Sequence, residues 1–106
     1  MIVLLTDVCK IDLRIIQENL DDFNESGTKF VDEIMKDMEK LKDTPKIGTS
    51  LQTKIDVTTD FRYMVFSFTK KQIYIIIYRV DEKEDIVYIN RIFDSRTNYL
   101  NILFGD

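Results

Sequence analysis

The segment Ile73-Tyr74-Ile75-Ile76-Ile77-Tyr78 contains only apolar or aromatic residues, and four of the six are β-branched. Successive side chains of a strand point to opposite faces of a sheet, so this segment is apolar on both faces. A strand of this kind lies in the interior of a sheet that is covered on each side. The sequence therefore predicts a central strand over residues 73–80.

Two segments of similar composition flank the central strand. Residues 61–68 and 86–92 are rich in aromatic and β-branched side chains, and the connectors at 69–72 and 81–84 are short and polar. Connections this short join antiparallel neighbours. We therefore expect a three-stranded antiparallel meander in the second half of the chain.

The first half of the chain has the period of helices instead. Apolar residues recur three and four positions apart, with acidic residues between them. The apolar stripes are Val8, Ile11, Ile15, Ile16, Leu20 and Phe23 in a first helix, and Phe30, Val31, Ile34, Met35, Met38 and Leu41 in a second. Thr6 or Asp7 is expected to cap the first helix, and Ser26 the second. Pro45 and Gly48 follow the second helix and end it. The two helices should pack as an antiparallel hairpin on one face of the sheet.

The two ends of the chain complete the predicted fold. Residues 2–5 predict a short buried strand, and Asp94 or Ser95 is expected to cap a short last helix that carries Tyr99, Leu100, Leu103 and Phe104. A partner or this last helix must cover the face of the sheet opposite the hairpin. The prediction is one α+β domain over residues 1–106. It consists of an N-terminal strand, an antiparallel helical hairpin packed on an antiparallel sheet (the meander plus the first strand), and a short C-terminal helix.

Composition excludes most enzyme classes. The chain has 106 residues, of which 44% are hydrophobic and 32% charged, the balance of a single globular domain. It has no histidine and one cysteine, Cys9, so nucleophile triads and zinc sites are out of reach and no internal disulfide forms. Three glycines are too few for a phosphate-cradling loop. We expect Cys9 to be a small buried hydrophobe, and the protein to be cytoplasmic, away from membranes and without a metal or cofactor.

The charge is unevenly distributed. The net charge is −4, and residues 1–50, with 7 basic and 11 acidic side chains, carry all of the excess. Residues 51–106 carry 8 of each sign. An acidic total disfavours a non-specific grip on nucleic acid, although it leaves room for a local basic patch in the second half.

The candidates for chemistry lie late in the chain. They are basic residues and one tyrosine: Lys70, Lys71, Arg79, Arg91, Arg96 and Tyr99. Arginine suits phosphate or carboxylate, because its planar guanidinium group bonds two oxygens at once. The alternative is that each arginine pairs with a nearby acid such as Asp81, Asp85 or Asp94, and composition alone favours this alternative.

Three segments resemble the closing half of the RelE/ParE toxins. They are Ile76-Ile77-Tyr78-Arg79-Val80, Ile86-Val87-Tyr88-Ile89-Asn90-Arg91-Ile92-Phe93 and Asp94-Ser95-Arg96-Thr97-Asn98-Tyr99-Leu100. In that superfamily a strand ending in Tyr-Arg-Val precedes a strand ending in Arg-Val or Arg-Ile, and a short Arg-x-x-Tyr-Leu element closes the domain. The order of elements in the first half agrees with the same family.

The resemblance implies the toxin of a type II toxin–antitoxin system. Such a toxin is neutralised by a small cognate antitoxin, which lays a helix or strand on its exposed apolar surface, so a toxin–antitoxin hetero-oligomer is expected. The acidic helical hairpin suits a basic antitoxin segment.

The resemblance leaves two mechanisms open. RelE-like members cut messenger RNA on the ribosome with Lys, Arg and Tyr side chains and without metal, and they carry an arginine early in the central strand, where this chain has Ile75. ParE-like members lack that arginine and poison DNA gyrase by protein contact, which we favour here. The candidate catalytic residues of the first mechanism are Arg79, Arg91, Arg96 and Tyr99. The candidate target-binding residues are Lys70, Lys71, Arg91 and Arg96. A third alternative is an inactive member that only binds its antitoxin.

Overall fold

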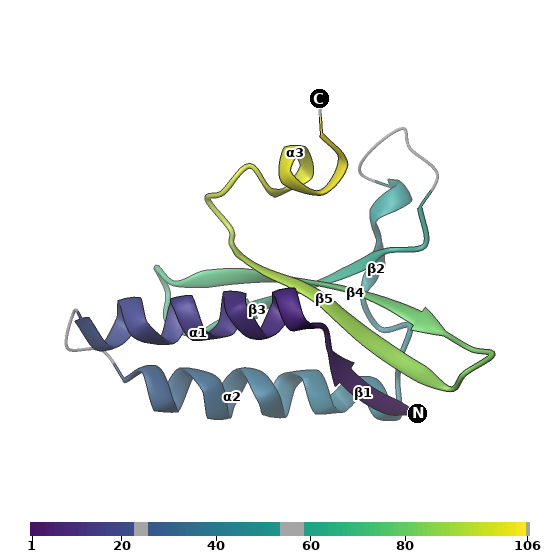
Figure 1. Cartoon of the computed structure of the whole chain (residues 1–106), viewed down its shortest axis with the longest axis horizontal. Coiled ribbons are helices and arrows are strands. Elements are labelled where there is room, and N and C mark those ends of the chain that lie inside the picture. Colours follow the sequence, from purple (N-terminus) through teal and green to yellow (C-terminus); the bar gives the residue numbers. More distant parts are fainter. Residues whose placement is uncertain (23–25, 54–58, 106) are drawn as a thin grey trace.

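A five-stranded sheet in the order β1-β5-β4-β3-β2 forms the middle layer of the protein. The computed structural model describes residues 1–22, 26–53 and 59–105. The strands are β1 (Ile2–Leu5), β2 (Thr49–Ser50), β3 (Arg62–Ser67), β4 (Ile73–Asp81) and β5 (Ile86–Asp94). The helices are α1 (Asp7–Asp22), α2 (Gly27–Glu39) and α3 (Tyr99–Phe104), with two short 3-10 turns at Lys40–Lys42 and Leu51–Thr53. Figure 1 shows α1 and α2 side by side on one side of the sheet and α3 on the other.

The antiparallel meander is confirmed. β4 pairs with β3 on one side and with β5 on the other, both antiparallel. The first strand departs from the expectation, because β1 lies parallel to β5, with Ile2 opposite Ile86. The sheet is therefore mixed and not wholly antiparallel. No hairpin joins β1 to β5, so turn geometry does not dictate their direction, and the parallel arrangement lets β1 lead directly into α1, which packs against β5.

β5 contains a β-bulge. Ile77 lies opposite Arg91 and Tyr78 lies opposite Ile89, so Asn90 has no partner on β4. The extra residue breaks the alternation of side chains: Ile89 and Ile92 both face the helical hairpin. Arg91 is thereby turned to the other face, toward α3.

Polar side chains begin both long helices, as the sequence predicts. The hydroxyl of Thr6 accepts a hydrogen bond from the backbone N–H of Cys9 at 3.2 Å, and the hydroxyl of Ser26 accepts one from Lys29 at 3.1 Å. Each bond satisfies one of the backbone donors that a helix start leaves open. The predicted last apolar position of the first helix, Phe23, lies outside the described residues.

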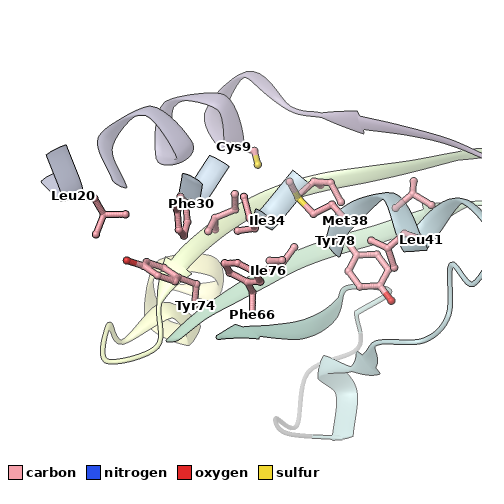
Figure 2. Packing of buried hydrophobic residues seen from close by; sticks show 13 residues of the cluster. Cys9, Leu20, Phe30, Ile34, Met38, Leu41, Phe66, Tyr74, Ile76 and Tyr78 are labelled. Carbon is pink, nitrogen blue, oxygen red and sulfur yellow. The ribbon is translucent and has the colours of Figure 1, made fainter. Parts of the chain in front are cut away.

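The larger core lies between the helical hairpin and the sheet, as Figure 2 shows. At its centre the ring of Phe30, from α2, makes edge-to-face contacts with Phe66, Phe68 and Tyr74 at centroid distances of 5.8, 5.4 and 4.9 Å. Ile76, directly beneath α2, has no exposed surface. The inward-facing apolar residues of the helical hairpin thus pack against one face of β4.

A second core lies on the opposite face, and the chain's own end covers it. Ile75, Ile77 and Phe93 of the sheet pack there with Leu51 and Tyr99. The start of the last helix differs from the prediction, because α3 begins at Tyr99 and neither acid nor serine at 94–95 caps it. β5 continues to Asp94, and that carboxylate bonds the backbone and side chain of Arg96 instead.

A buried tyrosine ties the loop before β2 to the sheet. Tyr78 has no exposed surface, and its hydroxyl accepts a hydrogen bond from the backbone N–H of Gly48 at 2.8 Å. Burial raises the pKa of the Tyr78 hydroxyl, against the opposing effects of that hydrogen bond and of the charge on Arg62. A Cβ atom on Gly48 would lie 2.5 Å from the Tyr78 hydroxyl oxygen and 2.6 Å from the carbonyl oxygen of Tyr63. Only glycine fits at this contact.

Replacing Gly48 by alanine should therefore destabilise the fold. We expect Gly48→Ala to lower the free energy of unfolding by roughly 1–3 kcal/mol, the usual cost of forcing an extra methyl group into a packed contact. Urea denaturation measures this change. Ile47→Ala, at the neighbouring position with 62% exposure, serves as the control and should change stability little. Equal stability of Gly48→Ala and the parent chain would contradict the close contact.

Burial should also make Cys9 unreactive. Desolvation, reinforced by the charge of Asp12, raises the pKa of the fully buried Cys9 thiol from 9.0 to about 12. We expect no alkylation of native protein by iodoacetamide at pH 8, and rapid alkylation in urea. Because the unfolded chain ionises the thiol at lower pH than the folded chain, this group should lower stability as the pH rises above about 9. Labelling of the native protein as fast as in urea would contradict the buried position.

Candidate functional site

The six candidate residues do not form one cluster. Arg79, Arg91 and Tyr99 lie on the α3 face of the sheet, whereas Lys70, Lys71 and Arg96 lie at the end of the sheet where the β3–β4 turn and the end of β5 meet. Each of the three arginines has an acidic partner. Arg79 pairs with Asp81 and Arg96 with Asp94, two of the nearby acids that the sequence suggested. Arg91 pairs with Asp12, which the sequence did not suggest.

Arg91 is held by Asp12 of α1. The carboxylate accepts from the Arg91 Nε at 2.7 Å, from its Nη2 at 3.1 Å and from the backbone N–H of Ile92 at 3.0 Å. The guanidinium also lies 4.6 Å above the ring of Phe93. The hydrogen bond that Arg91 donates to Asp12 raises the pKa of Arg91. The two side chains are 28% and 12% exposed, so this bidentate pair is a largely enclosed connection between α1 and β5.

On β4, Arg79 lies two residues beyond Ile77, which is the residue opposite Arg91. This spacing corresponds to about 7 Å along the strand. Its guanidinium lies 4.6 Å above the ring of Tyr88 and 3.9 Å from the carboxylate of Asp81. It also lines a hollow of about 540 Å³ at the start of β3. Lys46, Arg62 and Lys83 line the same hollow, and so do Asp60, Asp81 and Glu82. Cations and anions are thus mixed there.

Tyr99 is only 9% exposed and its ring is stacked on that of Phe93, with centroids 5.9 Å apart. It belongs to the second core, beside Ile75 and Ile77. The aromatic candidate of the sequence is therefore part of the packing under α3.

Arg96 and the two lysines share one end of the sheet. The Arg96 guanidinium, 81% exposed, donates to both carboxylate oxygens of Asp94 at 3.0 and 2.8 Å. This bond lowers the pKa of Asp94 and raises that of Arg96. Gln72 lines a hollow that includes Arg96 and a second one that includes Lys70 and Lys71. The three cations thus flank one glutamine, and all three are exposed to solvent.

The sequence interpretation missed a hollow between α1 and α3. Its volume is about 350 Å³, and it is lined by Thr6, Val8, Phe61, Asn90, Arg91, Ile102 and Leu103. Asn90, the bulge residue, has a buried Oδ1 that accepts no hydrogen bond from the described residues. The prediction that Val8, Ile11 and Ile15 belong to the inward stripe of α1 is wrong, because their side chains are 49%, 45% and 49% exposed.

The described residues contain no group of acidic or cysteine side chains close enough to hold a metal ion. None of the helices in the described ranges is both long and apolar enough to cross a membrane.

The Asp12–Arg91 pair should contribute to stability, and a double-mutant cycle tests this. We expect Asp12→Ala and Arg91→Ala each to lower the melting temperature, with a coupling free energy of about 1–2 kcal/mol between them, because the bonds are charge-assisted and partly enclosed. The matched cycle of Asp94→Ala and Arg96→Ala, an exposed pair, should give no coupling above error. Zero coupling at Asp12–Arg91 would mean that Arg91 is free for another role.

Comparison with known proteins agrees with the fold. The family model described as the ParE toxin of the type II toxin-antitoxin system, parDE, matches residues 3–99. Among solved structures, a chain of the intact E. coli RelBE toxin-antitoxin complex superposes with a TM-score of 0.56, covering 91% of this chain and 98% of that chain. The identity is 11%, so this likeness concerns the fold. No curated protein sequence matches. The match over residues 3–99 places the chain in the ParE toxin family of type II toxin–antitoxin systems.

Proposed function

We propose that the chain arrests growth by poisoning DNA gyrase through protein–protein contact, as the ParE-like resemblance implies. One observation carries the proposal: Ile75, which stands where RelE-like nucleases have an arginine, is 6% exposed and packs in the second core beneath α3. A buried isoleucine cannot stabilise a phosphate, and the face around it is filled with apolar side chains.

The other candidate catalytic residues also support protein–protein contact, and not RNA cleavage, as the mode of action. General acid–base work on an RNA 2′-hydroxyl needs donors and acceptors that converge within hydrogen-bond reach of one atom. Arg91 is engaged by Asp12, Tyr99 is stacked on Phe93, and Arg96 lies at the far end of β5 with Asp94. Arg79 is the candidate with the loosest acidic contact, at 3.9 Å. These engagements support protein contact as the mode of action.

A protein target needs exposed patches rather than a catalytic constellation. Lys70, Lys71 and Arg96 form an exposed cationic end of the sheet, and we assign target contact to this group. Arg91, also a candidate for target binding, is more enclosed and serves first to hold α1 on β5. The partner that neutralises the toxin is a small cognate antitoxin, and the two form a hetero-oligomer.

The first experiment is inducible expression in a bacterium without the antitoxin, followed by growth, messenger RNA integrity and the DNA-damage response together. Gyrase poisoning should give arrest with induced DNA damage and intact messages. Arrest with messages cut inside codons would replace gyrase by the RelE-like ribosome-dependent nuclease. Full growth with a folded protein would identify an inactive antitoxin-binding member.

The cationic end can be tested in the same assay. We expect Lys70→Glu combined with Lys71→Glu to keep the fold, because both residues are exposed in a turn, and to weaken target binding about tenfold or more. Survival at a fixed expression level is the measurement. Lys83→Glu is the matched control, since Lys83 is an exposed lysine in the other hairpin turn. If Lys83→Glu reduces toxicity as much as the double variant does, the net charge of the protein, and not this end of the sheet, determines target contact.

A further inference from the structure

The first strand forms one edge of the sheet, and half of its backbone groups point away from the sheet. β1 pairs with β5 alone and leads into α1, as Figure 1 shows. The N–H groups of Ile2 and Thr6 donate to β5, and successive residues of a strand direct their backbone groups to alternate edges. The N–H and C=O groups of Val3 and Leu5 therefore point outward. Within the part of the chain that the structure describes, no other group bonds them.

The two faces of β1 differ in exposure. The side chains of Val3 and Leu5 pack against the larger core. Ile2 and Leu4 lie on the opposite face, where they are 59% and 45% exposed. Two large aliphatic side chains thus lie beside unpaired backbone groups of the same strand. A strand edge of this kind is a template for pairing with another strand.

The protein closes the neighbouring edge but not this one. Beyond the end of β1, the carbonyl of Asn90 on β5 accepts from the Thr6 hydroxyl, and the N–H of Ile92 donates to Asp12. Proteins also protect a strand edge with proline, lysine or a β-bulge. Residues 2–5 contain neither proline nor lysine, and their register with β5 is unbroken. β1 therefore presents an unprotected edge.

This edge is complementary to itself. When two copies of β1 run antiparallel about a two-fold axis at Leu4, Val3 of one copy lies opposite Leu5 of the other. Both residues direct their backbone groups to this edge, so each such pair exchanges both N–H···O bonds. Leu4 then meets its own copy in the more closely spaced type of pair, with Cα atoms about 4.5 Å apart. Ile2 lies opposite Thr6.

The charges around the strand permit the same arrangement. Residues 1–6 have no charged side chain, so like charges do not meet along the paired strands. The first acidic residue, Asp7, follows the strand, and antiparallel pairing places the two copies of Asp7 at opposite ends, about 20 Å apart. Salt screens the repulsion between exposed charges at this distance.

We infer that the outer edge of β1 is a homodimer interface, at which two copies of the chain pair antiparallel along residues 2–6 and join their sheets into one. A strand of four residues gives a contact smaller than about 1,200 Å², which is typical of weak and transient complexes. The dimer therefore depends on concentration, with a dissociation constant on the order of 0.1 mM. This interface is separate from the target contact proposed above.

Sedimentation equilibrium from about 10 µM to 1 mM measures the association. We expect Leu4→Lys to raise the dissociation constant at least about tenfold, because it removes the central apolar contact and places two like charges opposite each other. Val65→Lys is the matched control. Val65 is 52% exposed on β3, toward the other side of the sheet, and this variant should dimerise within about twofold of the parent. Thermal melts verify that both variants fold.

Hydrogen exchange of the parent chain, followed by NMR, tests the same edge without any substitution. The N–H groups of Val3 and Leu5 should exchange about threefold more slowly at 1 mM than at 50 µM, because dimerisation bonds them. The N–H groups of Ile2 and Leu4, which are directed to β5 in monomer and dimer alike, should change little. This measurement decides the matter even if Leu4→Lys fails to fold.

Dissociation by Leu4→Lys alone, together with concentration-dependent protection of Val3 and Leu5, supports the interface. A parent chain that stays monomeric at the highest concentration overturns it. A dimer that forms without protection of Val3 and Leu5, or that Val65→Lys dissociates in place of Leu4→Lys, uses another surface, and the inference is then wrong. The growth assay tests the proposed function separately, so the two can fail independently.

Discussion

Both faces of β4 have to be buried, and the positions of the other helices and strands follow from this. One face closes against Phe30 and Ile34 of α2, and the other against α3 and Leu51. Without β4 between them, the helical hairpin on one side and α3 on the other would each expose large aliphatic side chains to water. Burial of such side chains is the main source of folding free energy. Since the short α3 completes the second layer, the C-terminal element is part of the core and not an appendage.

This constraint also shapes the functional surface. Apolar side chains fill the face of the sheet under α3. The arginines therefore lie at its margins, where they contact acidic side chains or aromatic rings. Asp12 illustrates the result: one carboxylate holds Arg91 and closes the edge of β5 where β1 ends. Among the described residues, Lys70, Lys71 and Arg96 are exposed at one end of the sheet, and Val8, Ile11 and Ile15 are exposed on the outer side of α1.

Most of the architecture could be predicted from periodicity, and most of the site could not. The meander follows from the composition of residues 61–92, and the helix starts follow from Thr6 and Ser26, because both signals are local. The Asp12–Arg91 pair joins residues 79 positions apart, and nothing local links them. The direction of β1 and the start of α3 also depend on tertiary packing. The exposure of Val8 and Ile15 could not be predicted, because hydrophobicity alone does not tell a buried helix face from an exposed one.

The bulge at Asn90 has a consequence for comparing relatives. The pairs on either side, Tyr78 with Ile89 and Ile77 with Arg91, are the pairs that an unbroken ladder would form if residue 90 were absent. The pairing of β4 with β5 therefore does not itself require residue 90. Homologues that lack this residue would keep the arginine in the same place, with the spacing to the preceding Tyr-Ile shortened by one. An alignment of the family should place its gap at this position, and a motif search that fixes the spacing around the arginine would miss true members.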